Sequence, residues 1–376
     1  MKYLHIIPMD RALIIPLVQM LNKYDKVNQH EYMVTVTFAS VLKNNPRMLC
    51  IRALDYIPAY KKGGNLRRMA YLLKRCRQAD YVVWHSFRTN GGYNPFLLFL
   101  DRKVLKKSIW LPADGEIGSY MNVANQFLNR FTARVNRYVQ THIGAVGVSF
   151  PSDLEVLVEQ GVKKERIVCL PYPIPQERVE LLHRASENTT EQADSKTGFQ
   201  IGLSSQAGNH HWQVIERVVG LTQYRGARAF IPLQFSVFHT PAPTGTKIYQ
   251  KQLRKQAKKL VCETVYLERP VSAETFMEQL RQIDAAFLAN NTACRTEFLL
   301  HLLAGGKKVF FPQNSPLYRY LNSVGANIQP LEELQRGRTL QEVLDRPAAC
   351  LPTELADFYD SEVVAERWIR YFASQK

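Results

Sequence analysis

The chain has 376 residues, of which 46% are hydrophobic, and it carries a formal net charge of +16 at pH 7. This hydrophobic content excludes a disordered chain, and the length favours two domains with a core in each. No apolar run approaches the roughly 18 residues that a membrane-spanning helix needs, and the six cysteines show no metal-ligand spacing. The composition therefore predicts a cytoplasmic globular protein with reduced thiols.

The positive charge lies mostly in the first half. Residues 1–173 contain 25 Lys and Arg against 12 Asp and Glu, a net charge of +13, whereas residues 174–376 have a net charge of +3. This asymmetry predicts an anionic partner for the first half, either nucleic acid or an acidic membrane surface. The alternative is a set of ordinary solvated helix faces. The main basic clusters are Lys61, Lys62, Arg67, Arg68, Lys74, Arg75, Arg77, Arg102, Lys103, Lys106, Lys107, Arg130, Arg134 and Arg137.

Strand and helix signals alternate along the first half. Asp10 and Arg11 interrupt the apolar N-terminus, which favours a first strand and helix over an export signal. Short continuous apolar runs are typical of strands buried on both faces of a parallel sheet. Such runs lie near residues 4–7, 33–38, 48–51, 81–84, 108–111, 145–148 and 167–170. The helices between them are expected near residues 12–21, 64–77, 96–100, 120–140 and 152–160.

The same plan restarts after the polar stretch 186–197, which reads as a linker. Strands are expected near residues 199–203, 230–235, 265–267, 286–288 and 309–311, and helices near 212–219, 249–259, 273–281, 297–304 and 317–321. We predict a first domain over 1–183, a linker over 184–198 and a second domain over 199–353. A last helix within 354–376 is expected to cross back to the first domain. The fold class is α/β, with two doubly wound Rossmann-like domains facing a central cleft.

Ligands of such sheets bind beyond the carboxyl ends of the strands. In the first half this places His85, Asn94 and Glu116 on the acceptor side of the predicted cleft. Asp114 follows a strand in the Gly-containing loop ADGEIG, where a carboxylate could act as general base toward a hydroxyl. Alternatively, Asp114 or Glu116 caps the helix expected near Ser119.

In the second half, a strand, a small polar loop and a helix start follow one another over residues 199–221. Unpaired N–H groups at a helix start favour bound anions, so we expect a diphosphate there. Arg269 or Arg295 could stabilise the leaving group as its negative charge develops. No DxD-like acidic pair follows a strand, so no metal is required. The loop's candidate donor-binding residues are Ser204, Ser205, Asn209 and His210.

Several segments together carry a resemblance to a known family. In order, they read WHSF, GGYNPFLLFL, SIWLPADGEIGSY, RYVQTHIGAVGVSFPSDL, IGLSSQAGNHH, FMEQLRQIDAAFLA and LLAGGKKVFFPQNSPLYRYL. This order resembles the enterobacterial 4-acetamido-4,6-dideoxygalactose transferases, also called 4-alpha-L-fucosyltransferases. The resemblance covers roughly residues 80–322, and no single motif in it is diagnostic.

The resemblance implies a metal-independent GT-B glycosyltransferase without a cofactor. Such an enzyme moves a sugar, for example a dTDP-linked amino-deoxy sugar, from a nucleoside diphosphate to a polyprenyl-diphosphate-linked saccharide. It works as a peripheral protein on the inner face of the cell membrane, in bacterial surface polysaccharide synthesis. Ser204, Ser205 and Asn209 match the donor diphosphate loop, and Asp114 matches an acidic acceptor-side position.

Two positions depart from the family pattern. Pro8 and Met9 stand where the family has a glycine after its first strand. Glu297 stands in a stretch that is small and uncharged in the family, where it could contact a sugar or ribose hydroxyl, or pair with Arg295 or His301 instead.

Two rival classes remain open. A nucleic-acid-binding protein would explain the charge, but no recognition module is present in the sequence. A non-catalytic nucleotide-sugar-binding protein would bind the donor without turnover.

Overall fold

The computed structural model describes residues 1–7, 13–44, 46–58, 64–87, 94–112, 116–119, 127–174, 176–187, 196–205, 207–233, 236–237, 247–290, 296–357 and 359–375. The chain divides into two compact units. Unit 1 comprises Met1–Ile174 and Phe358–Lys376, and unit 2 comprises Pro175–Asp357. The first division thus falls nine residues before the expected boundary at residue 183, and the helix Gln176–Glu187 belongs to unit 2.

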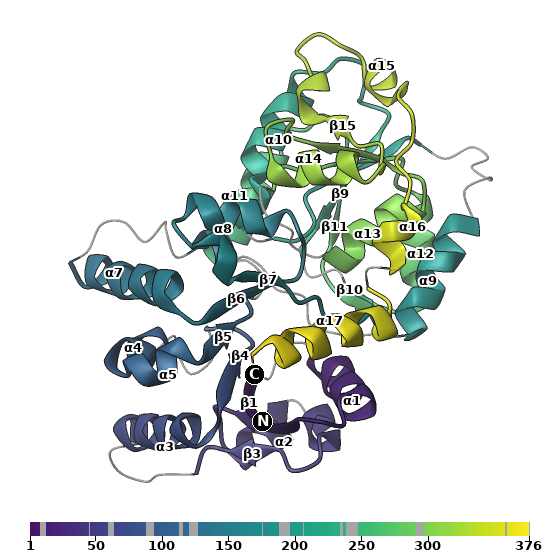
Figure 1. Ribbon diagram of the computed structural model, residues 1–376. Helices are drawn as coiled ribbons and strands as arrows, with labels where there is room; N and C mark the ends of the chain where they lie inside the picture. The colour runs from purple at the N-terminus through teal and green to yellow at the C-terminus, as the bar shows by residue number, and fades with distance from the viewer. Residues whose placement is uncertain are drawn as a thin grey trace. The chain divides into compact units, whose positions relative to one another are not determined.

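Unit 1 is built on a parallel sheet, which among the described residues has the strand order β3-β2-β1-β4-β5-β6-β7 (Figure 1). The strands are β1 (Lys2–Ile7), β2 (Gln29–Val34), β3 (Asp55–Tyr56), β4 (Tyr81–Trp84), β5 (Ser108–Trp110), β6 (Ala145–Val148) and β7 (Ile167–Cys169). The helical segments are α1 (Ile14–Tyr24), α2 (Phe38–Asn44), η1 (Pro46–Cys50), α3 (Gly64–Gln78), α4 (Asn94–Leu100), α5 (Arg102–Lys106), α6 (Glu116–Ser119), α7 (Phe127–His142), α8 (Asp153–Glu159), η3 (Lys164–Arg166) and α17 (Ser361–Ser374).

The two faces of this sheet carry separate hydrophobic cores. Helices α3, α4, α5, α7 and α8 cover one face, where they pack on side chains such as Val82, Trp84 and Trp110. Helices α1 and α17 cover the other face and lie side by side in Figure 1. On that face Trp368 and Phe372 of α17 are completely buried. The C-terminal helix is therefore an integral layer of unit 1.

Unit 2 repeats the architecture with the strand order β11-β9-β8-β13-β14-β15 among its described residues, and β10 pairs with β12 in a separate short ladder. The strands are β8 (Gly198–Ile201), β9 (Arg228–Pro232), β10 (Ser236–Val237), β11 (Glu263–Leu267), β12 (Pro270–Val271), β13 (Ala285–Phe287), β14 (Lys308–Phe311) and β15 (Gln329–Pro330). The helical segments are α9 (Gln176–Glu187), η4 (Ala207–Asn209), α10 (His211–Val219), α11 (Lys247–Ala257), α12 (Ala273–Arg281), α13 (Thr296–Ala304), α14 (Pro316–Ser323), η5 (Leu331–Glu333), α15 (Leu340–Leu344) and α16 (Thr353–Asp357).

Three expected elements are corrected by the structure. The strand expected at 48–51 is the 3-10 helix η1, which begins at Pro46, a residue that has no N–H for a strand ladder. The strand expected at 33–38 is β2 and starts four residues earlier, at Gln29. The single C-terminal helix is two helices, because Asp360 caps a new helix by accepting hydrogen bonds from the N–H groups of Glu362 and Val363.

Candidate functional site

The loop between β8 and α10 lies at the carboxyl end of the central strand of unit 2. It opens at Gly202, whose φ of +72° is in the left-handed region that favours glycine. A Cβ atom at this position would lie 2.5 Å from Nε2 of His211. The loop therefore needs glycine both for its backbone conformation and for the close approach of the first residue of α10.

Three of the predicted donor-binding side chains hold this loop together. Oδ1 of Asn209 accepts a hydrogen bond from the Leu203 N–H at 2.8 Å, and its Nδ2 donates to Oγ of Ser204 at 3.1 Å. Oγ of Ser205 donates to the Leu233 carbonyl at 2.9 Å and accepts from Gln250 at 3.2 Å. Ser204, Ser205 and Asn209 are all buried. They fix the shape of the loop, and their direct contact with a diphosphate stays a prediction.

Among the residues of the loop whose burial the structure describes, Gly208 and His210 are exposed. His210 has a φ of +46°, a strained conformation for a residue with a side chain, and it directly precedes the first turn of α10. The loop thus presents His210 to solvent directly before α10, whose first residue, His211, is buried.

His211 packs beneath this loop and is not among the predicted site residues. Its Nδ1 lies 2.9 Å from the Tyr249 hydroxyl of α11, and Trp212 stacks on the same tyrosine ring. Burial lowers the pKa of His211 to about 3, so the imidazole is neutral at neutral pH. Its partner Tyr249 is 38 residues away in the sequence, so no local pattern indicated this contact.

The remaining donor-side candidates lie at other strand ends of unit 2. Arg269 is exposed and follows β11, whereas Arg295 lies outside the described residues. Glu297 is half-buried in the first turn of α13. Nδ1 of His301 lies 2.7 Å from the backbone carbonyl of Glu297, so the pairing expected between these residues involves the main chain.

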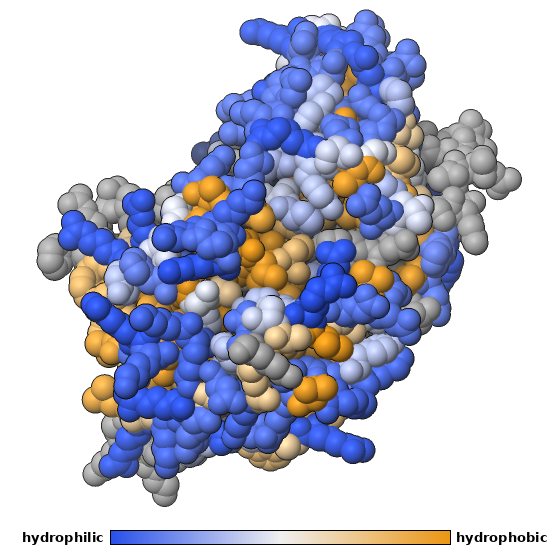
Figure 2. Space-filling model, viewed as in Figure 1, coloured by the Kyte–Doolittle hydropathy of each residue, from blue (hydrophilic) through white to orange (hydrophobic). Residues whose placement is uncertain are grey.

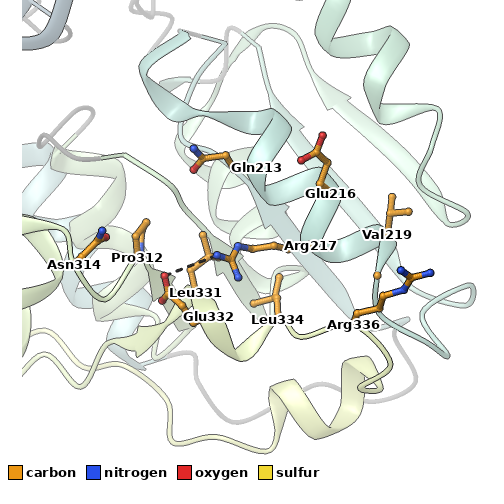
Figure 3. A pocket seen from close by; sticks show the side chains of 11 residues that line it. Gln213, Glu216, Arg217, Val219, Pro312, Asn314, Leu331, Glu332, Leu334 and Arg336 are labelled. Atoms are coloured by element: carbon orange, nitrogen blue, oxygen red, sulfur yellow. Dashed lines mark ion pairs between the residues drawn. The ribbon is translucent and has the colours of Figure 1, made fainter.

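A pocket of about 690 Å³ runs along the other side of α10, toward the segment after β15 (Figure 3). Gln213, Arg217 and Arg336 line it, and Nη2 of Arg217 lies 3.9 Å from Oε1 of Glu332. The predicted donor-binding residues that the structure describes do not line this pocket. Of its charged side chains, Arg217 and Glu332 point toward one another.

In unit 1 the carboxyl end of β4 is held by Glu116. This carboxylate is completely buried and accepts hydrogen bonds from Oγ of Ser86 at 2.6 Å and from the Phe87 N–H at 3.1 Å. Ser86 has a φ of +129°, a region that L-residues rarely adopt. Such strain persists where the surroundings enforce it, and it is concentrated at functional sites. Glu116 thus anchors a strained turn, and a direct contact with an acceptor stays a prediction.

The other acceptor-side candidates divide between described and undescribed parts of the chain. Asp114, the predicted general base, lies outside the described residues. Asn94 begins α4, and its side chain is not described. His85 is described and completely buried, next to the strained Ser86.

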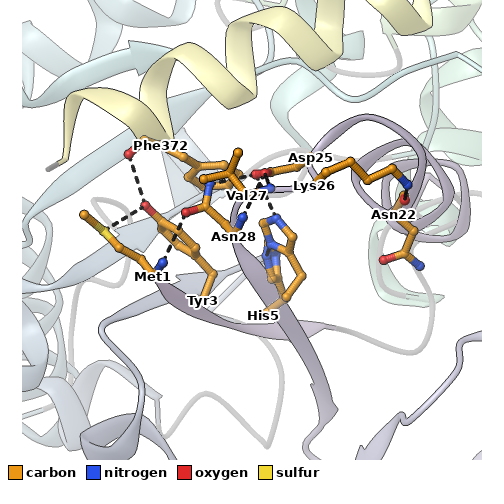
Figure 4. Close-up of polar contacts among 10 residues, drawn as sticks. Met1, Tyr3, His5, Asn22, Asp25, Lys26, Val27, Asn28 and Phe372 are labelled. Carbon is orange, nitrogen blue, oxygen red and sulfur yellow. Dashed lines mark hydrogen bonds and ion pairs between the residues drawn. The ribbon is translucent and has the colours of Figure 1, made fainter.

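His85 belongs to a row of buried polar side chains on the α17 face of the sheet. Its Nε2 lies 2.9 Å from Nδ1 of His5, and Nε2 of His5 lies 3.0 Å from Nδ1 of His30. Nε2 of His30 lies 3.0 Å from Oδ2 of Asp25. At the other end of the row, Nδ1 of His85 lies 2.5 Å from the Tyr172 hydroxyl. Figure 4 shows the Asp25 end of this row, with His5 and Asn28 beside it.

The buried histidines predict a loss of stability in acid. Burial lowers the pKa of His5, His30 and His211 below the usual value of 6.5, so the unfolded chain binds protons that the folded chain does not. Stability is therefore full above about pH 6.5 and falls below it, by up to about 1.4 kcal/mol per pH unit for each such histidine. Urea midpoints at pH 7.5, 6.5 and 5.5 measure the slope. His5→Gln should reduce this slope.

No protein-family model matches the sequence, and no curated protein matches it either. Solved structures do match the fold over nearly the whole chain. The structure of Anabaena Alr3699/HepE in complex with UDP and glucose matches with a TM-score of 0.62 at 11% identity, covering 100% of both chains. The lipopolysaccharide outer core galactosyltransferase WaaB, in its apo form, matches with a TM-score of 0.57 at 11% identity, covering 100% of this chain and 99% of the other.

A third match is the UDP-GlcNAc 2-epimerase from Neisseria meningitidis bound to UDP-GlcNAc, with a TM-score of 0.52 at 11% identity over 98% of this chain and 100% of the other. At these identities the likeness establishes the fold alone. Among the described residues, both units have the parallel sheet with flanking helices that these structures share. The chain therefore has the two-domain GT-B fold.

Proposed function

We propose that this protein is a glycosyltransferase, which moves a sugar from a nucleoside diphosphate to a lipid-linked saccharide in bacterial surface polysaccharide synthesis. The β8–α10 loop of unit 2 is the observation that carries the proposal. It sets a helix start and an exposed histidine at the carboxyl edge of the sheet, in a fold shared with a UDP-bound structure. The resemblance to the 4-acetamido-4,6-dideoxygalactose transferases supports an amino-deoxy sugar as the donor sugar.

The donor diphosphate would lie against the start of α10. N–H groups there and the exposed His210 can donate hydrogen bonds to phosphate oxygens. Ser204 and Asn209 contribute by keeping the loop in shape. Arg269 and Arg295 are candidates for the charge-assisted bond to the leaving diphosphate, and Glu297 for a hydroxyl of the sugar or ribose.

Asn209→Asp tests the donor site without removing the support of the loop. An aspartate has nearly the same shape and can still accept from the Leu203 N–H and from the Ser204 hydroxyl. Its negative charge should repel a neighbouring diphosphate, and we expect UDP or dTDP affinity to fall at least about tenfold. Calorimetric titration measures the affinity. Unchanged affinity in a folded variant would move the donor site away from this loop.

An anionic membrane is the partner that we propose for unit 1. Phe96, Phe99 and Leu100 of α4 and Phe131 of α7 are exposed apolar side chains on the helix layer that also carries the basic helix α5. Figure 2 shows apolar and hydrophilic side chains intermingled over this part of the surface. Apolar side chains that insert and basic side chains that attract acidic headgroups are the usual combination in peripheral membrane binding. No described helix is long and apolar enough to span a bilayer.

Membrane binding should depend on helix α5. Each Lys or Arg near an acidic bilayer contributes about 1 kcal/mol, so replacing Arg102, Lys103 and Lys106 with glutamine should weaken binding about 100-fold. Vesicle cosedimentation measures it, with neutral and acidic lipid and with added salt, which screens the attraction. The matched control replaces Lys251, Lys255 and Lys258, which are exposed in unit 2. An equal loss in both variants would contradict a docking face on unit 1.

Nucleoside diphosphate release in the presence of a membrane lipid extract tests the reaction itself. A transferase releases the nucleoside diphosphate only when an acceptor is present, and the lipid gains the sugar. The similarity to UDP-GlcNAc 2-epimerases gives a second candidate, which would convert the nucleotide sugar without an acceptor. Donor binding without sugar transfer and without conversion of the nucleotide sugar would indicate a non-catalytic nucleotide-sugar-binding protein. Binding to nucleic acid in place of lipid would support the nucleic-acid-binding class.

A further inference from the structure

The row of side chains from Tyr172 through His85, His5 and His30 to Asp25, here called the relay, spans one face of the unit 1 sheet. His85 and Tyr172 lie just after β4 and β7, at the carboxyl edge where ligands of open α/β sheets bind. Asp25 caps α1 and precedes β2, at the amino edge. All five side chains are buried or nearly so. A continuous hydrogen-bonded path therefore connects the carboxyl edge of the sheet with the buried carboxylate of Asp25.

The surroundings of Asp25 favour the ionised carboxylate. Burial alone would raise the pKa of Asp25, but hydrogen bonds from Asn28, His30 and the Val27 N–H hold that pKa below its usual value. The backbone N–H groups of Val27 and Asn28 each donate to Oδ1 at 3.1 Å, and Nδ2 of Asn28 donates to Oδ2 at 2.9 Å. An ionised carboxylate can only accept, so the His30 ring must donate its Nε2–H to Asp25.

This one constraint sets the direction of every hydrogen bond in the relay. A neutral imidazole has one donor and one acceptor nitrogen. Nδ1 of His30 therefore accepts from His5, Nδ1 of His5 accepts from His85, and Nδ1 of His85 accepts from the Tyr172 hydroxyl. Each of the four bonds holds one proton, and no histidine needs a charge. Adding a single proton reverses all four bonds and neutralises Asp25, so the relay is a store for one proton.

The surroundings favour this neutral arrangement. Burial and the neighbouring His30 and His85 lower the pKa of His5 well below its usual value. Tyr3 stacks on His30, Tyr32 lies against His5, and α17 contributes the uncharged rings of Trp368 and Phe372. Burial lowers the pKa of His30 by more than the hydrogen bond and charge of Asp25 raise it, and the N-terminal ammonium group lowers it further. The imidazole nitrogens of the relay are hydrogen-bonded to one another in a row and do not converge on a common point. The described residues include no cluster of His, Cys, Asp or Glu arranged to hold a metal.

We propose that the relay takes up the proton that a saccharide hydroxyl releases at the carboxyl edge of unit 1. This inference rests on the proposed transferase function, and it assigns to the relay the role that the sequence predicted for Asp114. Tyr172 is 2% exposed, so the saccharide hydroxyl has to approach the Tyr172 oxygen from the carboxyl edge, and the proton alone enters the relay.

The transfer step balances along this path. The acceptor oxygen forms a bond to the anomeric carbon, and the bond from that carbon to the diphosphate oxygen breaks, its electron pair leaving with the nucleoside diphosphate. The acceptor proton passes to the Tyr172 oxygen as the tyrosine's own proton moves to Nδ1 of His85. Each following proton moves one hydrogen bond further, and the last one protonates the Asp25 carboxylate.

The test interrupts the relay far from the ligand edge. His5→Gln keeps a donor and an acceptor but cannot pass a proton through, and Asp25→Asn removes the final acceptor. We expect kcat to fall about 100-fold in both variants, as on loss of a general base, with the dissociation constant for UDP or dTDP unchanged. Tyr3→Phe is the matched control, because it removes a buried hydroxyl from the same face outside the relay. Its kcat should stay normal.

Two readouts separate proton transfer from structural support. In mixtures of H₂O and D₂O, the wild-type rate should curve with the deuterium fraction, because several protons move together, and the curvature should vanish in both variants. The wild-type rate should hold at pH 6, because burial lowers the pKa values of His5 and His30 below 6.5, and it should fall only at the lower pH at which the relay gains its proton. Variants with normal kcat and a reduced melting temperature would overturn the proposal. So would a 100-fold loss in Asp114→Asn beside a normal His5→Gln. Donor binding without any wild-type transfer would instead contradict the proposed function.

Discussion

Replacing Gly202 with valine should abolish measurable nucleoside diphosphate binding by unit 2. The φ of +72° at this position is strongly unfavourable for a β-branched residue, and a Cβ atom would press on the His211 ring at 2.5 Å. The start of α10 must then move, and the N–H groups that we propose for the diphosphate move with it. We expect the affinity for UDP or dTDP to fall by more than about 100-fold, which is about 2.8 kcal/mol.

Gly208→Ala is the control for this variant. Gly208 lies in the same loop, but a Cβ atom there would meet nothing within 4 Å, and its φ is not in the left-handed region. Its affinity should stay within a few-fold of wild type. Calorimetric titration on both variants, with circular dichroism to check folding, makes the comparison. Equal binding by wild type and a folded Gly202→Val variant would contradict the donor site.

Trp368→Ala should destabilise unit 1 by about 3–5 kcal/mol, the usual cost of deleting a large buried side chain. The Trp368 ring is completely buried on the sheet, and its Nε1–H donates to the Pro171 carbonyl at 2.9 Å. It also stacks on His85 of the relay. Trp368→Phe keeps most of the buried ring and should cost clearly less.

Hydrogen exchange is the suitable measurement, because a two-unit protein need not unfold in one step. Amide exchange should accelerate in β1 and β4 of unit 1, while β8 and β13 of unit 2 provide the internal reference. Equal acceleration in both units would show that α17 stabilises the whole chain rather than unit 1.

The sequence predicted the strands that are apolar on both faces. The runs at Tyr81–Trp84, Ala145–Val148 and Lys308–Phe311 stand out because parallel strands under two helix layers must be apolar. It misplaced β2 because His30 and Glu31 make its first half polar. Glu31 pairs with Lys2 and Arg75, whereas His30 belongs to the relay, which needs partners from β1 and from the ends of β4 and β7. Pairings across so many separate segments leave no local pattern to read.

The candidate site was predictable in position but not in the role of each side chain. Small polar residues between a strand and a helix located the β8–α10 loop correctly. The same residues serve equally well as ligands or as internal supports, and only the geometry shows Asn209 bonded to Leu203 and Ser204. His211 escaped notice because its partner Tyr249 lies on the next helix.

A thermal-shift screen of nucleoside diphosphates tests the proposed donor site. We expect UDP or dTDP to stabilise the protein, with a shift in melting temperature that grows with ligand concentration. A ligand at 100 times its dissociation constant adds about 2.7 kcal/mol of apparent stability. GDP and ADP provide the comparison, and Asn209→Asp should lose the shift, which is measured against the ligand-free variant because a charge at this buried position lowers the variant's own melting temperature. No stabilisation by any nucleoside diphosphate, or equal stabilisation of wild type and Asn209→Asp, would contradict a donor site at the β8–α10 loop.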